Sequence, residues 1–402
     1  MKFRRWHRLP LIWGFALVLT LMSSQLIAPI QARVEAPVAQ ELRGVWLTTN
    51  DLDVIVDRPR LHNALDQLTQ LNFNTLYPVV WNSGYVLFPS DTAKRAGIQT
   101  FIRRGLQDYD LLEELASEAH RRGLAVIPWF EFGFMAPPTS EMALNHPDWL
   151  TQKRDGGQTW LGAAGEVVWL NPFRPEVQQF LTQLVLELVS RYDIDGIQFD
   201  DHFSLPVEFG YDSYTRNLYR RETGRAVPAD PHNPSWVKWR ADKLSDFTRR
   251  LSAAVKARQR DITVSIAPNP YDYAYKAQVQ DWRTWVRQGW VDELIVQIYR
   301  ASLGAFRQQL YDPTIQEARR KIPTAAGILT GLRNSPVPIS FIEAKVRSAR
   351  SAGVGMAFFF YESLWEQAPE PAIERQERFR DFFSTPTAGR RSGTPAAIAE
   401  PL

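Results

Sequence analysis

Strand-like and helix-like segments alternate along most of this chain, and that alternation constrains the fold more than any other feature. Short runs rich in β-branched and aromatic residues predict strands over 42–48, 73–80, 124–131, 195–200, 262–268, 293–299, 324–329 and 354–362. Longer segments between them predict helices over 59–71, 108–122, 175–192, 235–259, 278–288, 303–321, 339–352 and 366–383. Strand–helix pairs repeated in this way predict an α/β fold, a (β/α)8 TIM barrel in one domain from residue 42 to residue 383.

The main alternative is a doubly wound open sheet. Such a sheet would carry a glycine-rich turn such as GxGxxG after its first strand, whereas this chain has Gly44-Val45-Trp46 in that region. The predicted helix-to-strand connections are short, and the strand-to-helix connections are long after the second, third and fourth strands. Barrel enzymes build their sites from the loops at the C-terminal ends of the strands, so the loop lengths predict a functional site at that face.

The two ends of the chain are expected to lie outside the barrel. Residues 1–32 place basic residues before an apolar run, which is typical of a signal peptide or, if uncleaved, of an N-terminal membrane anchor. Residues 33–41 then form a linker, and residues 384–402 lack apolar periodicity and predict a disordered tail. The expected location is periplasmic or secreted, with membrane contact only through an uncleaved leader.

Composition excludes several kinds of function. The chain has no cysteine, which excludes disulfides, thiolate metal sites and cysteine nucleophiles. A net charge of +3 without runs of Lys and Arg argues against a nucleic-acid partner. The six histidines form no HxH or HExxH pair, and neither GxSxG nor a P-loop occurs. No cofactor and no metal is expected, and a metal-dependent hydrolase using Asp200, Asp201 and His202 is the weakest alternative.

Carboxylates gather at predicted strand ends. Glu131 ends the third strand, Asp200 and Asp201 end the fourth, and Glu362 ends the eighth. Glycoside hydrolysis uses two carboxyl groups, one ionised and one protonated. Apolar, aromatic surroundings raise the pKa of a carboxyl group and suit it to act as a general acid. Acids at three strand ends on one rim therefore favour a glycosidase site. The alternative is that each acid only caps the loop that follows its strand.

Aromatic and amide side chains form a second pattern. Indole rings stack on the C–H faces of sugars, while sugar hydroxyls bind amides and carboxylates. The residues expected to bind substrate are Trp46, Trp81, Asn82, Trp129, Gln198, His202, Asn269, Gln297, Tyr299 and Tyr361. The predicted loops add Trp149, Trp160 and Trp169. For each tryptophan, packing between the helices and the barrel remains the alternative.

Several segments, in order, resemble the glycosyl-hydrolase-like family 10. They are LRGVWLTT at 42–49, FNTLY at 73–77, YVLFPS at 85–90, WFEFGF at 129–134, DGIQFDD at 195–201, WRTWVRQGW at 282–290 and QIY at 297–299. The resemblance implies an extracytoplasmic bacterial barrel that acts on envelope or exopolysaccharide glycans and is distantly similar to alpha-amylases and alpha-galactosidases. By position it implies that Asp200 is the nucleophile. Gln198 stands where the amylase pattern has Arg, which puts amylase-type substrate contacts in doubt.

The sequence thus predicts an exported glycoside hydrolase whose partner is a polysaccharide or oligosaccharide. Asp200 is expected to be the nucleophile or stabilising carboxylate, and Asp201 to orient substrate or share the charge. Either Glu131 or Glu362 is expected to be the acid/base. The alternative function is a non-catalytic glycan-binding barrel in polysaccharide export or envelope assembly.

Overall fold

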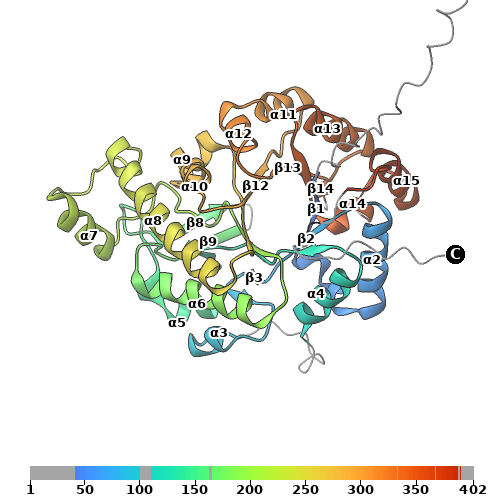
Figure 1. The fold of residues 1–402 in the computed structure, drawn as a ribbon. Coiled ribbons are helices and arrows are strands. Elements are labelled where there is room, and N and C mark those ends of the chain that lie inside the picture. Colours follow the sequence, from blue (N-terminus) through green and yellow to red (C-terminus); the bar gives the residue numbers. More distant parts are fainter. Residues whose placement is uncertain are drawn as a thin grey trace, which may run out of the picture. The chain divides into compact units, whose positions relative to one another are not determined.

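A curled parallel sheet forms the centre of the fold (Figure 1). Its strands are β1 (Arg43–Leu47), β2 (Thr75–Pro78), β5 (Ala125–Val126), β6 (Trp129–Phe130), β10 (Gly196–Asp200), β11 (Thr263–Ala267), β12 (Glu293–Gln297), β13 (Thr324–Leu329) and β16 (Gly355–Phe359). They pair in the order β5-β2-β1-β16-β13-β12-β11-β10-β6, and all neighbours are parallel.

The two ends of that order lie next to each other in the chain. β5 and β6 are separated only by Ile127 and Pro128, and proline cannot donate a ladder hydrogen bond. The backbone N–H of Val80, just after β2, donates to the carbonyl of Trp129 in β6 (2.9 Å). The sheet therefore curls back to its starting point in a barrel-like fold, and the predicted α/β class is confirmed.

The computed structural model describes residues 41–99, 110–162, 165–332, 334–366, 368–387 and 390. These residues belong to a single compact unit, Ala39–Leu402. The predicted leader, nearly all of the predicted linker and most of the predicted tail lie outside the described residues. Among the helices that are described, none is both long enough and apolar enough to cross a membrane.

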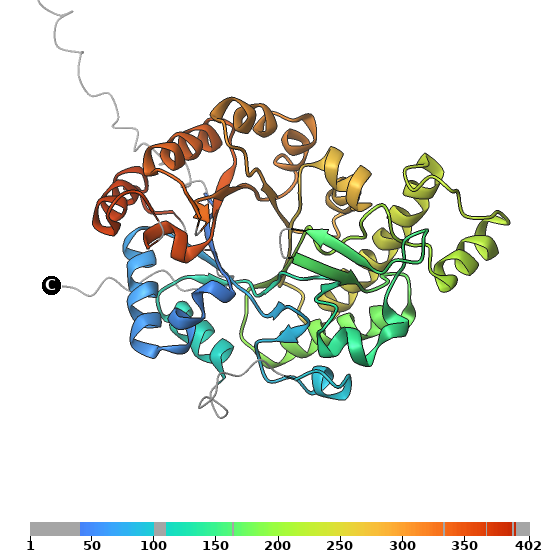
Figure 2. The same cartoon turned by 180° about the vertical axis from the view of Figure 1, so that it is seen from behind.

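Helices surround the sheet in both views (Figures 1 and 2). The principal ones are α2 (Arg58–Gln70), α4 (Leu111–Arg121), α6 (Pro175–Arg191), α8 (Pro234–Arg258), α10 (Trp282–Arg287), α11 (Leu303–Leu310), α13 (Ile339–Ser351) and α15 (Ala372–Phe382). Capping fixes their starts: Asp57 accepts from the N–H of Arg60 at α2, and Asp110 accepts from the N–H of Glu113 at α4.

Several predicted elements have other bounds than expected, and two of them show the physical reason. The helix predicted over 303–321 is divided into α11 and α12 (Pro313–Ala318), because Pro313 starts a new helix that Asp312 caps. The strand predicted over 354–362 was too long, since β16 stops at Phe359 and α14 (Tyr361–Trp365) follows. The hydroxyl of Ser363 accepts from the N–H of Phe360 (3.1 Å), which turns the aromatic run into a helix start.

Alternate strand residues enter two apolar clusters. Val45 of β1 and Leu294 of β12 join the large cluster that also contains residues of the surrounding helices. Their chain neighbours Trp46 and Ile295 join a separate, smaller cluster made largely of strand residues. Because successive side chains of a strand point to opposite faces, the smaller cluster fills the inner face of the curled sheet.

The longest insertions between a strand and the next principal helix follow three of the strands at their C-terminal ends. After β2 come β3 (Trp81–Asn82), β4 (Tyr85–Val86) and α3 (Asp91–Arg95). After β6 come β7 (Met135–Ala136), α5 (Glu141–Asn145), β8 (Thr159–Gly162) and β9 (Gly165–Trp169), and α7 (Ser213–Thr223) follows β10. Figure 2 shows β8 and β9 as green arrows beside the centre of the curled sheet.

The described part of the C-terminal segment lies against the N-terminal ends of the strands. Arg390 donates to the hydroxyl of Thr75 in β2 (3.0 Å) and forms an ion pair with Glu293, the first residue of β12. The side chain of Glu293 is fully buried. The hydroxyl of Thr387 accepts from the amide of Asn74 (2.9 Å). Thr387 and Arg390 fall in the segment predicted to be a disordered tail. Arg390 supplies the positive charge that pairs with the buried carboxylate of Glu293.

Candidate active site

Ionisable side chains meet where β6 and β10 end. They are Glu131, Asp200, Asp201 and His202. The sheet register pairs Phe130 of β6 with Phe199 of β10. Glu131 and Asp200 are the next residues on these two parallel strands, so the fold brings the two predicted acids together.

Asp200 is held as a buried, oriented carboxylate with 2% of its surface exposed. The indole N–H of Trp129 donates to Oδ2 (3.2 Å), and the backbone N–H of His202 donates to Oδ1 (2.9 Å). Burial raises the pKa of Asp200 to about 6, although the charge of His202 acts in the opposite direction. At neutral pH this group is therefore mainly ionised and can act as a nucleophile or stabilise a positive charge.

Glu131 is a second carboxyl group at the site with a raised pKa. The side-chain amide of Asn82 donates to Oε2 of Glu131 (2.5 Å). Burial raises the pKa of Glu131 to about 7, opposed by the Asn82 hydrogen bond and assisted by the negative charge of Asp200. A carboxyl group that is partly protonated at neutral pH can both give and take a proton, as an acid/base residue must.

His202 supplies positive charge to the acids. Its Nδ1 lies 2.8 Å from the carbonyl oxygen of Glu131 and 3.2 Å from Oδ1 of Asp200. Both partners are acceptors, so Nδ1 carries a proton. Burial disfavours the charged ring, but the carboxylates of Asp201 and Asp200 outweigh it and raise the pKa of His202 to about 10. The imidazolium helps to keep Asp200 ionised.

Asp201 is surrounded by amide donors. Its Oδ2 accepts from Asn269 (2.9 Å) and Gln278 (3.3 Å), and its Oδ1 accepts from Gln297 (3.0 Å). Asn269 and Gln297 were predicted to bind substrate, and in this structure they fix Asp201. Gln278 was not singled out from the sequence, because it lies in α9 (Tyr271–Gln278), away from any strand end.

A polar chain runs beneath Asp200 on the inner face of the sheet. Gln198, two residues earlier on β10, accepts from the indole of Trp46 (2.7 Å) and donates to the hydroxyl of Ser265 (2.9 Å). Ser265 in turn donates to Glu293 (2.8 Å). Trp46 and Gln198 are both buried, so they support the site from below.

Phe359, the last residue of β16, links several predicted aromatic residues. Its ring centroid lies 5.6 Å from Tyr299, 6.0 Å from Trp46 and 6.2 Å from Trp129. Sequence reasoning missed Phe359 because the strand was predicted to continue to residue 362, so Phe359 was not expected at a strand end. The arrangement gives the acids an aromatic boundary on the side of the first and last strands.

Sequence comparison adds independent information about this chain. A family model described as Glycosyl hydrolase-like 10 matches residues 41–347. The chain belongs to that family. Glycosyl hydrolase DigH of Escherichia coli (strain K12) is 28% identical over 301 residues, which cover 65% of this chain and 66% of that protein. Glycosyl hydrolase YngK of Bacillus subtilis (strain 168) is 22% identical over 324 residues, 73% of this chain and 61% of that protein. The chain thus spans a little under two thirds of the length of these relatives.

Solved structures show the same fold. The glycoside hydrolase domain of PgaB (BpsB) from Bordetella bronchiseptica superposes with a TM-score of 0.62 at 17% identity, covering 85% of this chain and 98% of that domain. At such low identity the similarity concerns the fold alone. It agrees with the barrel-like arrangement of this glycosyl-hydrolase-like family 10 member.

Three predicted site residues of this family member do not lie among the four ionisable groups; Trp81 instead supports the loop after β6, since its indole N–H donates to the carbonyl of Gly133 (3.1 Å). Trp81 is fully buried, and its ring packs on Phe180 of α6 with centroids 5.9 Å apart. The hydroxyl of Tyr361 donates to Gln67 of the outer helix α2 (3.0 Å). Glu362 lies in the first turn of α14 rather than at the end of a strand. The geometry therefore favours Glu131 over Glu362 as the partner of Asp200.

Asp51 is a buried acid that sequence reasoning missed. It follows β1, and burial raises its pKa to about 7. Its oxygens accept from the backbone N–H groups of Thr48 (2.6 Å) and Glu362 (2.8 Å). These bonds join the turn after β1 to the start of α14, so Asp51 has a structural role. The Thr48-x-x-Asp51 spacing of a capping box was the available signal.

Gly133 was quoted only within a motif, yet it fixes the position of His202. A Cβ atom at Gly133 would lie 2.5 Å from the carbonyl carbon and oxygen of His202. The next residue, Phe134, donates its N–H to that carbonyl (3.1 Å). Only glycine allows the loop after β6 to approach the loop after β10 this closely.

Two groups of side chains in the described part of the chain have metal-ligand composition. The atoms of Asp200, Asp201 and His202 lie within 4.8 Å of one another, but the ring nitrogen that faces both carboxylates is Nδ1 (3.2 and 3.7 Å), and it carries a proton that it donates to the backbone carbonyl of Glu131. The residues therefore fit a metal ion poorly.

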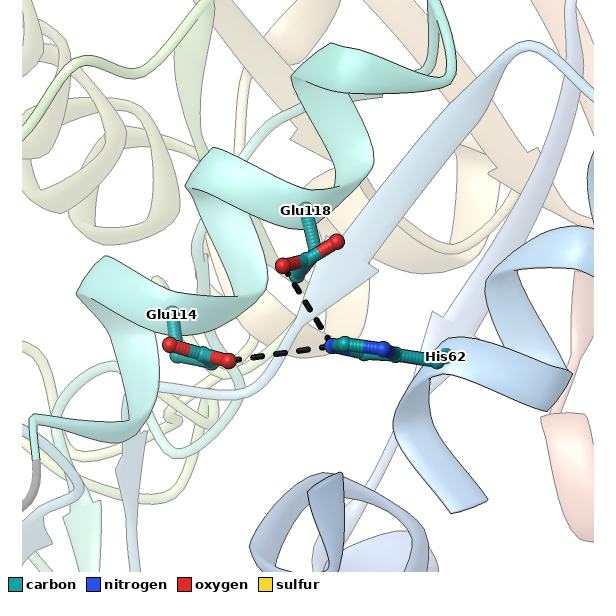
Figure 3. A group of neighbouring side chains, drawn as sticks. All are labelled: His62, Glu114 and Glu118. Atoms are coloured by element: carbon teal, nitrogen blue, oxygen red, sulfur yellow. Dashed lines mark ion pairs between the residues drawn. The ribbon is translucent and has the colours of Figure 1, made fainter. Parts of the chain in front are cut away.

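The second group joins α2 to α4 (Figure 3). Nε2 of His62 lies 3.3 Å from Glu118 and 3.7 Å from Glu114. Arg122 pairs with the other oxygen of Glu118 (2.6 Å), and Arg58 pairs with Glu114 (3.4 Å). Because arginines already neutralise both carboxylates, this group is an ion-pair network between two helices.

Proposed function

We propose that this protein is an exported glycoside hydrolase that acts on envelope or extracellular polysaccharide with two carboxyl groups. The observation that carries the proposal is the pair Asp200 and Glu131 on adjacent strands. Burial raises the pKa of Asp200 to about 6 and that of Glu131 to about 7. Membership in a glycosyl-hydrolase-like family and relatives named glycosyl hydrolases support it.

The carboxyl groups then have distinct roles. Glu131 protonates the glycosidic oxygen, so that the C–O bond breaks and the leaving sugar departs with that proton. Asp200 stabilises the positive charge that develops at the anomeric carbon, or forms a bond to it. Glu131, now ionised, takes a proton from the water whose oxygen bonds to the anomeric carbon; any bond from Asp200 to that carbon breaks in the same step, and the starting protonation states are restored. The indole N–H of Trp129 keeps the Asp200 carboxylate in place.

Two finer features belong to the same proposal. We infer that the curled sheet is a complete (β/α)8 barrel of one domain, and that the long segments after its second, third and fourth strands build the substrate cleft. We also infer that residues 1–32 direct the protein to the periplasm or the exterior, or anchor it there. The glycan partner would then be met outside the cytoplasm.

The test compares the wild type with Asp200→Asn and with a matched control, Asp193→Asn, whose side chain is 77% exposed before β10. Reducing ends released from a panel of bacterial and plant polysaccharides are measured, and folding is checked by circular dichroism. We expect product from the wild type and the control and none from Asp200→Asn. Turnover at the wild-type rate by Asp200→Asn would refute the assignment. Absence of product from every protein, with glycan still retained, would indicate a non-catalytic glycan-binding barrel.

A further inference from the structure

A β-hairpin extends from the candidate active site. β8 and β9 are antiparallel, with Trp160 opposite Val167. β9 also pairs with β7, Trp169 lying opposite Met135, and β7 follows β6 and Glu131 closely in the chain. The hairpin is therefore connected through backbone hydrogen bonds to the segment that carries the acid/base residue. Figure 2 shows it beside the centre of the curled sheet.

Two indole rings lead from the acids along this hairpin. The ring of Trp169 lies 6.2 Å from that of His202, and its N–H donates to the carbonyl of Ser204 (2.7 Å). The ring of Trp160 lies a further 6.2 Å away, at 86° to Trp169. Trp169 is 1% exposed and belongs to the core, whereas Trp160 is only partly buried. The outer ring thus keeps surface available to a ligand.

The Trp160 ring lies over Gly162. Residues 160 and 162 share one face of β8, since side chains alternate along a strand. A Cβ atom at Gly162 would lie 2.2 Å from Cζ3 and 2.9 Å from Cε3 of Trp160. The indole therefore occupies the space that a side chain at position 162 would need. Leu161, on the opposite face, is 81% exposed.

We propose that Trp160 forms a distal sugar-binding subsite, and that the substrate is a glycan chain long enough to reach from Asp200 to the hairpin. The inference rests on the proposed hydrolase function, whose substrate class it narrows. The C–H face of a sugar ring matches the face of an indole. Trp160 packs on Trp169, which in turn packs beside His202, so Trp160 lies two ring contacts from the acids, and a glycan that contacts both Asp200 and Trp160 would be an oligosaccharide.

The test uses native gels cast with one soluble polysaccharide each: glycol chitosan, carboxymethyl cellulose, xylan, alginate or cell-wall glycan strands. The full chain is compared with Trp160→Ala, Gly162→Ala and the adjacent control Leu161→Ala, after thermal unfolding has shown that all are folded. We expect at least one polysaccharide to retard the wild type and Leu161→Ala equally. Trp160→Ala should bind it about tenfold more weakly. Gly162→Ala should also bind more weakly, because it displaces the ring.

Two results overturn the subsite: equal retardation of Trp160→Ala and wild type, or no retardation of the wild type in any gel. Assays of product release separate this inference from the hydrolase proposal. If Trp160→Ala binds more weakly but the wild type releases no product, the result supports the Trp160 subsite and refutes the proposed hydrolase function. If the wild type and Trp160→Ala release product from the polymer at equal rates, the result supports the hydrolase function and refutes the Trp160 subsite.

Discussion

The hydrogen bond from Asn82 to Glu131 gives a test of the acid/base assignment. An amide donor 2.5 Å from Oε2 stabilises the ionised form of Glu131 and so lowers its pKa. In Asn82→Ala that stabilisation is lost and the pKa of Glu131 rises. Because the acid must be protonated to donate, the alkaline limb of the rate profile should move to higher pH.

The size of this shift follows from the energy of one hydrogen bond to a charged group. Such a bond contributes about 1.5 kcal/mol, and about 1.4 kcal/mol corresponds to one pH unit. Glu131 is partly accessible, so water replaces some of the lost donor, and about one pH unit is an upper limit. Starting from a pKa of Glu131 of about 7, the alkaline limb should therefore move toward about pH 8.

The assay is kcat/KM for release of reducing ends, measured from about pH 4 to about pH 10, which reports the ionisations of the free enzyme. The acid limb, set by the pKa of Asp200 near 6, is the internal control and should stay in place. Ser83→Ala removes only the hydroxyl that donates to the Asn82 oxygen (2.6 Å) and should give a smaller shift of the same sign. An alkaline limb that stays fixed or moves to lower pH in Asn82→Ala would refute the role of Glu131.

The remaining predictions concern stability and metal dependence. Gly133→Ala should lower the free energy of unfolding by about 2 kcal/mol in urea denaturation, because the new methyl group meets the backbone of His202. Arg390→Ala should lower it by about 3 kcal/mol by leaving Glu293 buried without its ion pair, and adding Glu293→Gln should restore part of the loss. Activity should survive a chelator, because the His202 nitrogen that faces Asp200 and Asp201 is the protonated Nδ1; loss of activity that added metal restores would contradict this.

The parallel strands were predictable because each is a short apolar run with clear boundaries. β13 spans the residues expected, 324–329. The end of β16 was not predictable in the same way, since the aromatic residues around Phe360 favour a strand and the hydroxyl of Ser363 decides for a helix. At Phe360 the strand propensity of the aromatic residues was overridden by the helix cap that Ser363 provides. At Pro313 the helical pattern was interrupted because the proline ring starts a new helix.

The candidate site was predictable only as far as strand ends bring residues together. The neighbouring positions of Asp200 and Glu131 follow from adjacent parallel strands. Asn82, which tunes Glu131, and Gln278, which binds Asp201, come from distant segments, and their pairing depends on how the loops fold. Trp81 illustrates the same limit. The sequence does not distinguish a tryptophan after a strand end that faces a ligand from one that faces a helix, and the ring of Trp81 packs on Phe180 of α6.

The ion pair between Arg390 and Glu293 has a consequence for biosynthesis. The two residues are 97 positions apart in the chain, and the arginine is made later. Until residue 390 has been synthesised, the inner face of the sheet contains a carboxylate without that cation. A chain cut short or trimmed before this residue would therefore hold a less stable barrel, and cellular proteases act preferentially on such destabilised forms. The addition of Arg390 during synthesis therefore contributes to the stability of the molecule against proteolysis.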